Sequence, residues 1–211
     1  KEFNAIFHSD TVQTIAHYPL DMQTLNVDFI TASAHKFHGP KGVGFIYISE
    51  NIKINPLLLG GSQERNMRAG TENIYAIAGL EKAMQLSYAS MDQDMIYVKG
   101  LKKYMISQLT KNIDGISFYG NSNDLDNSLF KVLSVAFPAI PNSEMLLFNL
   151  DIMGVSCSGG SACSSGSVGG SHVLNAISID TKKPGVRFSF SKYNTIEEID
   201  YTITKLNEIF N

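Results

Sequence analysis

Long apolar runs are absent from this 211-residue sequence, and cysteine is scarce, with only two residues of that type. No stretch approaches the roughly 20 apolar residues that a membrane-spanning helix needs, and two cysteines cannot form the disulfide framework of a small secreted protein. The start of the chain lacks the apolar core of a signal peptide. A net charge of −3 without a basic cluster argues against nucleic acid as the main partner. We therefore expect a soluble, cytoplasmic protein.

A hydrophobic content of 44% in a chain of this length is enough for one large or two small cores. Residues 1 to about 90 alternate apolar runs with turns and end in a helical pattern, so the first part is predicted to be α/β. The second part, from about residue 91, is predicted to be α+β. It has expected strands at 116–119, 129–137, 155–158 and 186–190, and expected helices at 95–109, 143–150, 172–177 and 195–210. The last helix has Thr195 and Glu198 at capping-box spacing.

The segment SAHKFHGPKG, residues 33–42, follows an apolar run at 27–32 that is typical of a strand in a covered sheet. Ligands of open α/β sheets bind beyond the carboxyl ends of strands, which is where this run delivers Lys36. An unprotonated lysine amine forms a Schiff base with an aldehyde, and burial or nearby cations favour that form. Taken alone, the ordinary interpretation of Lys36 is a solvated surface group.

Asp10 follows a second apolar run, Phe3 to Phe7, in the segment HSDTVQ. If this run and the 27–32 run are neighbouring parallel strands, Asp10 and Lys36 lie at the same edge of the sheet. A lysine imine and an aspartate beside a ring nitrogen are the two groups that pyridoxal phosphate requires. The alternative for Asp10 is a helix N-cap, with a helical turn at 17–22.

Four ordered motifs then resemble one family. Residues 8–13 with 33–45, the segment GGSQERNMRAGT at 60–71, the loop GGSACSS at 159–165 and the strand GVRFSF at 185–190 are similar to segments of class V aminotransferases, particularly the cysteine desulfurases. The resemblance implies a fold-type I architecture. Residues 1–90 would be the C-terminal part of a large cofactor-binding domain with a mainly parallel sheet, and residues 91–211 a small α+β domain.

The resemblance also implies roles for the residues around the first motif. Lys36 would be the Schiff-base lysine of pyridoxal phosphate, and Asp10 would partner the pyridine nitrogen. Gln13 would hydrogen-bond the ring hydroxyl oxygen. Ser33 and His35 would contact the phosphate, and a hydroxyl and an imidazole suit a dianion. We expect no metal.

Further along the chain, the resemblance implies that Thr71 reaches the cofactor phosphate of a neighbouring subunit in a homodimer. Cys163 would take sulfur from L-cysteine as a persulfide, release alanine, and hand the sulfur to an acceptor or iron–sulfur scaffold protein. Arg187 would bind the substrate carboxylate, since its planar fork suits that group. At period two Arg187 lies opposite Val186 and Phe188.

Each of these residues also has a simpler interpretation. Thr71 is a candidate N-cap for a helix running from residue 72, with Ile74 and Ala83 near one face. The Gly/Ser-rich stretch around Cys163 is typical of a linker, and Arg187 could face solvent on an edge strand. Cys157, which the family pattern does not require, is interpreted as a small buried residue, with a reversible disulfide or relay to Cys163 as the alternative.

Family members carry a segment before the region that matches Lys1, which holds further cofactor-binding groups. We therefore expect this chain to be a C-terminal portion that alone binds pyridoxal phosphate weakly and has little activity. Two other functions stay open: a related enzyme such as a selenocysteine lyase or an aminotransferase, and a non-catalytic sulfur-carrier or scaffold-docking module that presents Cys163.

Overall fold

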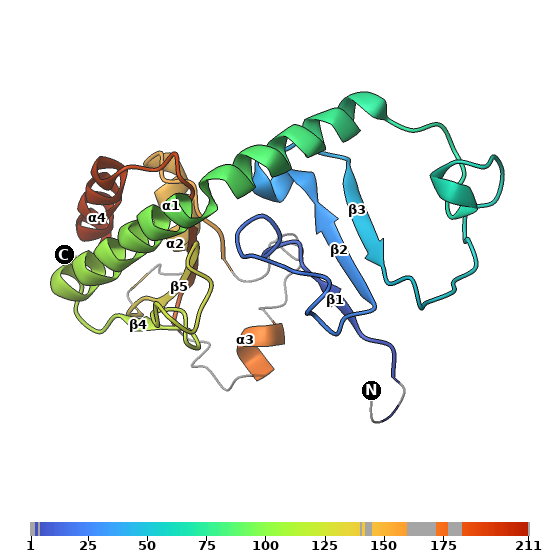
Figure 1. The fold of residues 1–211 in the computed structure, drawn as a ribbon. Coiled ribbons are helices and arrows are strands. Elements are labelled where there is room, and N and C mark those ends of the chain that lie inside the picture. Colours follow the sequence, from blue (N-terminus) through green and yellow to red (C-terminus); the bar gives the residue numbers. More distant parts are fainter. Residues whose placement is uncertain are drawn as a thin grey trace. The chain divides into compact units, whose positions relative to one another are not determined.

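The computed structural model describes residues 3, 5–139, 141, 145–159, 172–176 and 183–210. They form two compact units, Lys1–Asp92 and Gln93–Asn211, and each has its own three-stranded sheet and apolar core (Figure 1). None of the helices in these ranges combines the length and the apolar character that crossing a bilayer requires.

The first unit contains the strands β1 (His8–Asp10), β2 (Phe29–Ser33) and β3 (Gly44–Ile48) in that order. β1 is parallel to β2, with Asp10 opposite Thr31, which confirms the predicted parallel pairing. The strand forms just after the apolar run expected to make it. Phe7 still contacts the start of β2: its carbonyl accepts the Asp28 and Phe29 amides, and its amide donates to Asp28 Oδ2 at 2.9 Å. β3 runs antiparallel to β2, so the sheet is mixed.

Directly after β2 the chain turns into the short 3-10 helix η1 (Ala34–Phe37), whose Ala34 and Phe37 are fully buried. His38 adopts a left-handed backbone with φ of 65°, which lets the Gly39 amide donate to the Ala34 carbonyl at 2.8 Å. A side chain at Gly39 would lie 2.8 Å from the Ala34 Cβ, so the turn requires glycine there.

The helix α1 (Ile74–Asn112) begins in the first unit and ends in the second. Two separate helices were expected, but the 39-residue span contains no proline and continues without a break. Thr71 is not its N-cap: the Asn73 Oδ1 accepts the Ala76 amide at 3.2 Å, and asparagine is at least as good a cap. The predicted apolar face is also wrong in part, because Ile74 is exposed and Ala76 is buried with Ala83.

The second unit contains the antiparallel strands β4 (Ser117–Phe118), β5 (Val132–Ala136) and β6 (Gly185–Ser189). Its helices are α2 (Leu146–Ile152), α3 (His172–Ala176) and α4 (Ile196–Phe210). The α+β prediction is therefore confirmed, although residues 155–158 make only one bridge, from Ser158 to Arg187, instead of a strand.

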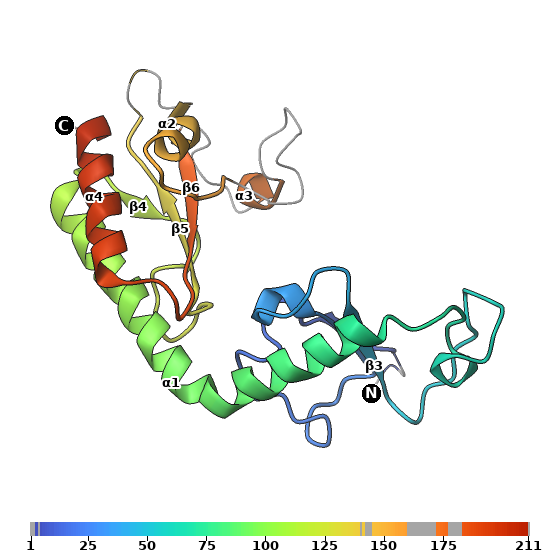
Figure 2. The same ribbon diagram turned by 90° about the horizontal axis from the view of Figure 1, so that it is seen from above.

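Within this unit α4 and the end of α1 lie side by side on one face of the sheet (Figure 2). The predicted capping box of α4 is confirmed, since the Glu198 amide donates to Thr195 Oγ1 at 3.3 Å and the Thr195 amide donates to Glu198 Oε2 at 3.2 Å. The core combines Leu133, Val135, Val186 and Leu206 from the sheet and α4. This core buries the face of β6 that carries Val186 and Phe188.

Candidate functional site

The carboxyl ends of β1 and β2 bring four of the predicted site residues to one edge of the first sheet. Asp10 is the last residue of β1, Ser33 is the last residue of β2, and His35 and Lys36 follow in η1. Because the two strands are parallel, these ends point the same way. Lys36 and His35 are exposed, so the described residues do not supply the burial that the sequence suggested for Lys36.

Asp10 and the residues after it are held by local hydrogen bonds. The Val12 amide donates to Asp10 Oδ1 at 2.9 Å, which orients the carboxylate. Thr11 is buried and donates through both its amide and its hydroxyl to the Thr31 carbonyl, at 3.0 and 2.8 Å. The helical turn considered at 17–22 is not formed, so Asp10 orders a turn and caps no helix. Gln13 is exposed in this turn.

Two further contacts order the segment that carries Lys36. Ser33 Oγ lies 2.9 Å from His35 Nδ1, so a hydroxyl and an imidazole form one polar pair beside the lysine. The Nε2 atom of His17 lies 3.1 Å from the Lys36 carbonyl oxygen. The sequence singled out Ser33 and His35 but not His17, because nothing in the sequence around His17 indicates a contact with a residue 19 positions away.

Thr71 lies at the end of a segment that leaves the sheet after β3 and returns at α1 (Figure 1). This segment contains the 3-10 turn η2 (Glu64–Asn66), in which three consecutive residues have φ between 48° and 66°. Such a backbone is rare outside glycine and is retained where the surroundings demand it. The Gly70 amide donates to Gln63 Oε1 at 3.1 Å, and Thr71 itself is exposed.

Arg187 lies in the middle of β6, in the second unit, with Val186 and Phe188 buried on the opposite face as predicted. Its backbone pairs on one side with Ser134 and on the other with Ser158, whose carbonyl accepts the Arg187 amide at 2.6 Å. The Arg187 Nε atom is buried, and among the described residues it has no hydrogen-bond partner. A buried charged donor without an acceptor is costly, so Arg187 Nε could donate to an anion placed beside it.

Cys163 lies outside the described residues. The segment that leads toward it is described as far as Gly159, and the bridge between Ser158 and Arg187 holds its start against β6. Cys157, two residues before the end of that range, is half-buried and packs against the second core. Burial, and secondarily the negative charge of Asp151, raises the pKa of the Cys157 thiol to about 11.

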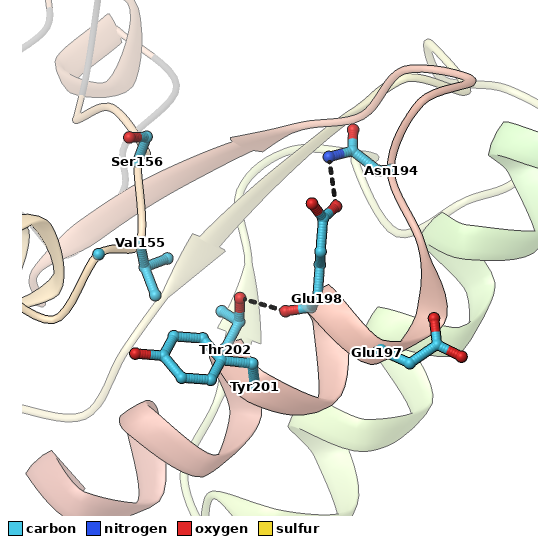
Figure 3. A pocket seen from close by; sticks show the side chains of 8 residues that line it. Val155, Ser156, Asn194, Glu197, Glu198, Tyr201 and Thr202 are labelled. Carbon is cyan, nitrogen blue, oxygen red and sulfur yellow. Dashed lines mark hydrogen bonds between the residues drawn. The ribbon is translucent and has the colours of Figure 1, made fainter.

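A groove of about 460 Å³ lies beside this same segment, between residues 154–156 and the start of α4 (Figure 3). Several of its polar groups already have partners. Glu198 accepts from Asn194 Nδ2 at 2.9 Å, and the Tyr201 hydroxyl donates to the Met153 carbonyl at 2.8 Å. The sequence did not predict this groove, because its walls come from segments about 40 residues apart.

Comparisons with known proteins agree on one family. The profile of the family described as aminotransferase class-V matches residues 1–202. The chain is 43% identical to a cysteine desulfurase IscS of Dictyoglomus turgidum, covering 99% of this chain and 52% of the relative. It is 42% identical to a putative cysteine desulfurase IscS 1 of Bacillus subtilis, covering 94% and 52%. A solved NifS-like protein superposes with a TM-score of 0.86 at 36% identity, covering 99% and 53%. The chain thus spans about half the length of the curated relatives it matches.

Proposed function

Because this chain belongs to the aminotransferase class-V family, we propose that it forms part of a pyridoxal-phosphate-dependent cysteine desulfurase. The proposed reaction removes sulfur from L-cysteine, releases L-alanine and leaves a persulfide on Cys163. The relatives named cysteine desulfurase, which align with nearly the whole chain, support this proposal. In it, the first unit is part of the cofactor-binding domain and the second unit is the small domain.

The residues at the edge of the first sheet fit pyridoxal phosphate by their chemistry. When bound, this cofactor supplies an electron sink that weakens bonds at the α-carbon of an amino acid. In the proposal Lys36 provides the amine that anchors it, and the Asp10 carboxylate holds a proton on the ring nitrogen. Gln13 hydrogen-bonds the ring hydroxyl oxygen, and the polar pair of Ser33 and His35, 2.9 Å apart, binds the phosphate.

The single observation that carries the substrate assignment is the buried, unpartnered Nε of Arg187. A guanidinium binds a carboxylate through two parallel hydrogen bonds, so an α-carboxylate would supply the acceptor that the described residues do not. Since Arg187 also pairs with Ser158, the residue proposed to hold the substrate is adjacent in the sheet to the segment that leads to Cys163.

The chemistry of Cys163 follows from its thiol. The deprotonated sulfur is the nucleophile, and it attacks the sulfur of the bound cysteine. A sulfur–sulfur bond forms while the bond between the substrate's β-carbon and its sulfur breaks. The bonding electrons stay with the β-carbon, which takes up a proton and becomes the methyl group of alanine. The persulfide then passes its outer sulfur to an acceptor or iron–sulfur scaffold protein.

A homodimer is part of the proposal, with Thr71 reaching the cofactor phosphate of the partner subunit. The surroundings of Thr71 support it. Leu57 and Leu59, in the same segment between β3 and α1, and Tyr75, in the first turn of α1, are 93%, 80% and 86% exposed in the chain by itself. A contiguous exposed apolar patch marks a surface that a partner covers, and a homodimer that brings Thr71 to the partner's cofactor would cover these side chains.

The proposal is tested with the full-length protein that contains this chain, supplied with pyridoxal phosphate and L-cysteine. We expect alanine release that is lost in Cys163→Ser. Arg187→Lys keeps the charge but removes the two parallel N–H donors of the guanidinium. Because a charge-assisted hydrogen bond contributes about 1.5–3 kcal/mol, we expect this variant to lower kcat/KM about 10- to 150-fold. Ser189→Ala, on an exposed position of the same strand, serves as the matched control. Alanine release that persists in Cys163→Ser would contradict the proposal.

A further inference from the structure

The turn that carries Lys36 depends on its neighbours for its position. η1 has only four residues, and its N-cap Ser33 makes no side-chain capping bond. The His38 and Gly39 amides both donate to the Ala34 carbonyl and close the turn, and the Ala34 amide ties its start to the Val43 carbonyl at 3.0 Å. Short 3-10 helices have poor hydrogen-bond geometry, so contacts from outside decide where their residues lie.

The contact to Lys36 itself comes from His17. The Nε2 atom of His17 lies 3.1 Å from the Lys36 carbonyl oxygen. A carbonyl can only accept a hydrogen bond, so Nε2 must carry the proton and donate. This bond joins the loop that follows Asp10 and β1 to the backbone of Lys36 in η1.

The backbone before His17 is strained in a way that serves this contact. Ala16 has φ of 60°, a left-handed conformation that costs a residue with a side chain energy relative to glycine. Ile15 and Ala16 are each only 3% exposed, and they belong to the same core cluster as Ala34 and Phe37 of η1. Packing therefore holds the unusual turn in place, and the next side chain after it reaches η1.

We propose that His17 is a positioning residue for Lys36: it fixes the lysine backbone by donating from Nε2 to the Lys36 carbonyl. The amine of Lys36 then starts from a defined point relative to Asp10, which is held on the neighbouring strand. The inference rests on the proposed function in one respect, that Lys36 is the reacting amine. The structural half of it, the ordering of η1 by His17, does not.

The first test measures hydrogen exchange by mass spectrometry on the full-length protein without cofactor. His17→Leu removes the donor, and we expect residues 36–39 to exchange about 2- to 10-fold faster, as the loss of one hydrogen bond allows. His17→Gln can place an amide N–H near the Nε2 position and should restore most of the protection. His8→Leu, a histidine on the exposed start of β1, is the matched control and should leave this segment unchanged.

The second test measures alanine release from L-cysteine by the same variants. A displaced amine lowers kcat, by as much as about 100-fold for a shift near 1 Å, while KM changes little because Arg187 is untouched. We expect His17→Gln to restore most of the kcat that His17→Leu loses. Unchanged exchange in His17→Leu, or a Gln variant no better than Leu, would overturn the inference. If the protein releases no alanine at all, the proposed function fails, whereas the exchange result still decides the role of His17.

Discussion

Cys157 should be a poor nucleophile despite its place six residues before Cys163. Its thiol is half-buried against the second core, and burial raises its pKa from 9.0 to about 11, with Asp151 adding to the effect. A thiol pKa higher by about 2 lowers the thiolate fraction near neutral pH about 100-fold. A more basic thiolate is intrinsically about 6- to 10-fold more reactive toward disulfides, which offsets part of the loss. The net expectation is a reaction about tenfold slower than that of an unperturbed thiol.

The assay uses Cys163→Ser, which leaves Cys157 as the single thiol of the chain, and an aromatic disulfide as the reagent. The rate at which the folded protein reacts with the disulfide should still rise about tenfold per pH unit between about pH 8 and 10, since the pKa of Cys157 is about 11. The same variant unfolded in urea provides the control and should level off near the ordinary thiol pKa. Asp151→Asn should lower the midpoint only slightly, because desolvation is the larger cause.

This reasoning would be refuted if the reaction rate of the folded protein levelled off near pH 9, or if the folded and unfolded proteins reacted at equal rates. The result also bears on the sulfur relay considered for the two cysteines. A thiol with a pKa of about 11 is almost fully protonated near neutral pH. It would therefore accept sulfur from a persulfide slowly, so the structure favours Cys157 as a packing residue.

The remaining predictions concern the stability of the second unit, measured by urea unfolding. Burial lowers the pKa of the fully buried Lys102 below 10.5, so the unfolded chain binds more protons than the folded one in that range. The contribution of Lys102 to stability should therefore rise with pH from that lowered value up to about 10.5, measured as the difference between the unaltered protein and Lys102→Met. Thr195→Ala removes the acceptor for the Glu198 amide and should cost about 1 kcal/mol. Leu133→Ala, at a fully buried position, should cost about 2–5 kcal/mol, whereas Phe148→Ala, at a mostly exposed one, should cost far less.

Local chemistry was enough to predict the elements whose signals lie within a few residues. The capping box of α4 depends on two residues three positions apart, and both hydrogen bonds form. The parallel pairing of β1 with β2 followed from a general rule for neighbouring strands, although the strand forms slightly later in the chain than its apolar run. These features needed no knowledge of the rest of the molecule.

Long-range packing decided the features that the sequence did not predict correctly. The face that α1 buries is one of them: Ala83 joins the core cluster of Ala34 and Phe37, whereas Ile74 is exposed. The contact of His17 with Lys36 and the unpartnered Nε of Arg187 also arise between distant segments. The sequence motifs identified Arg187, but only the structure gives a physical reason to expect an anion beside it.

The most direct test of the central claim is to find which lysine holds pyridoxal phosphate. The full-length protein is treated with the cofactor, reduced with borohydride to trap any imine, digested and analysed by mass spectrometry. The account predicts a phosphopyridoxyl group on Lys36, with Lys41, an exposed lysine five residues later in the same region, as the internal control. A label on Lys41, or one spread evenly over the exposed lysines, would contradict the account.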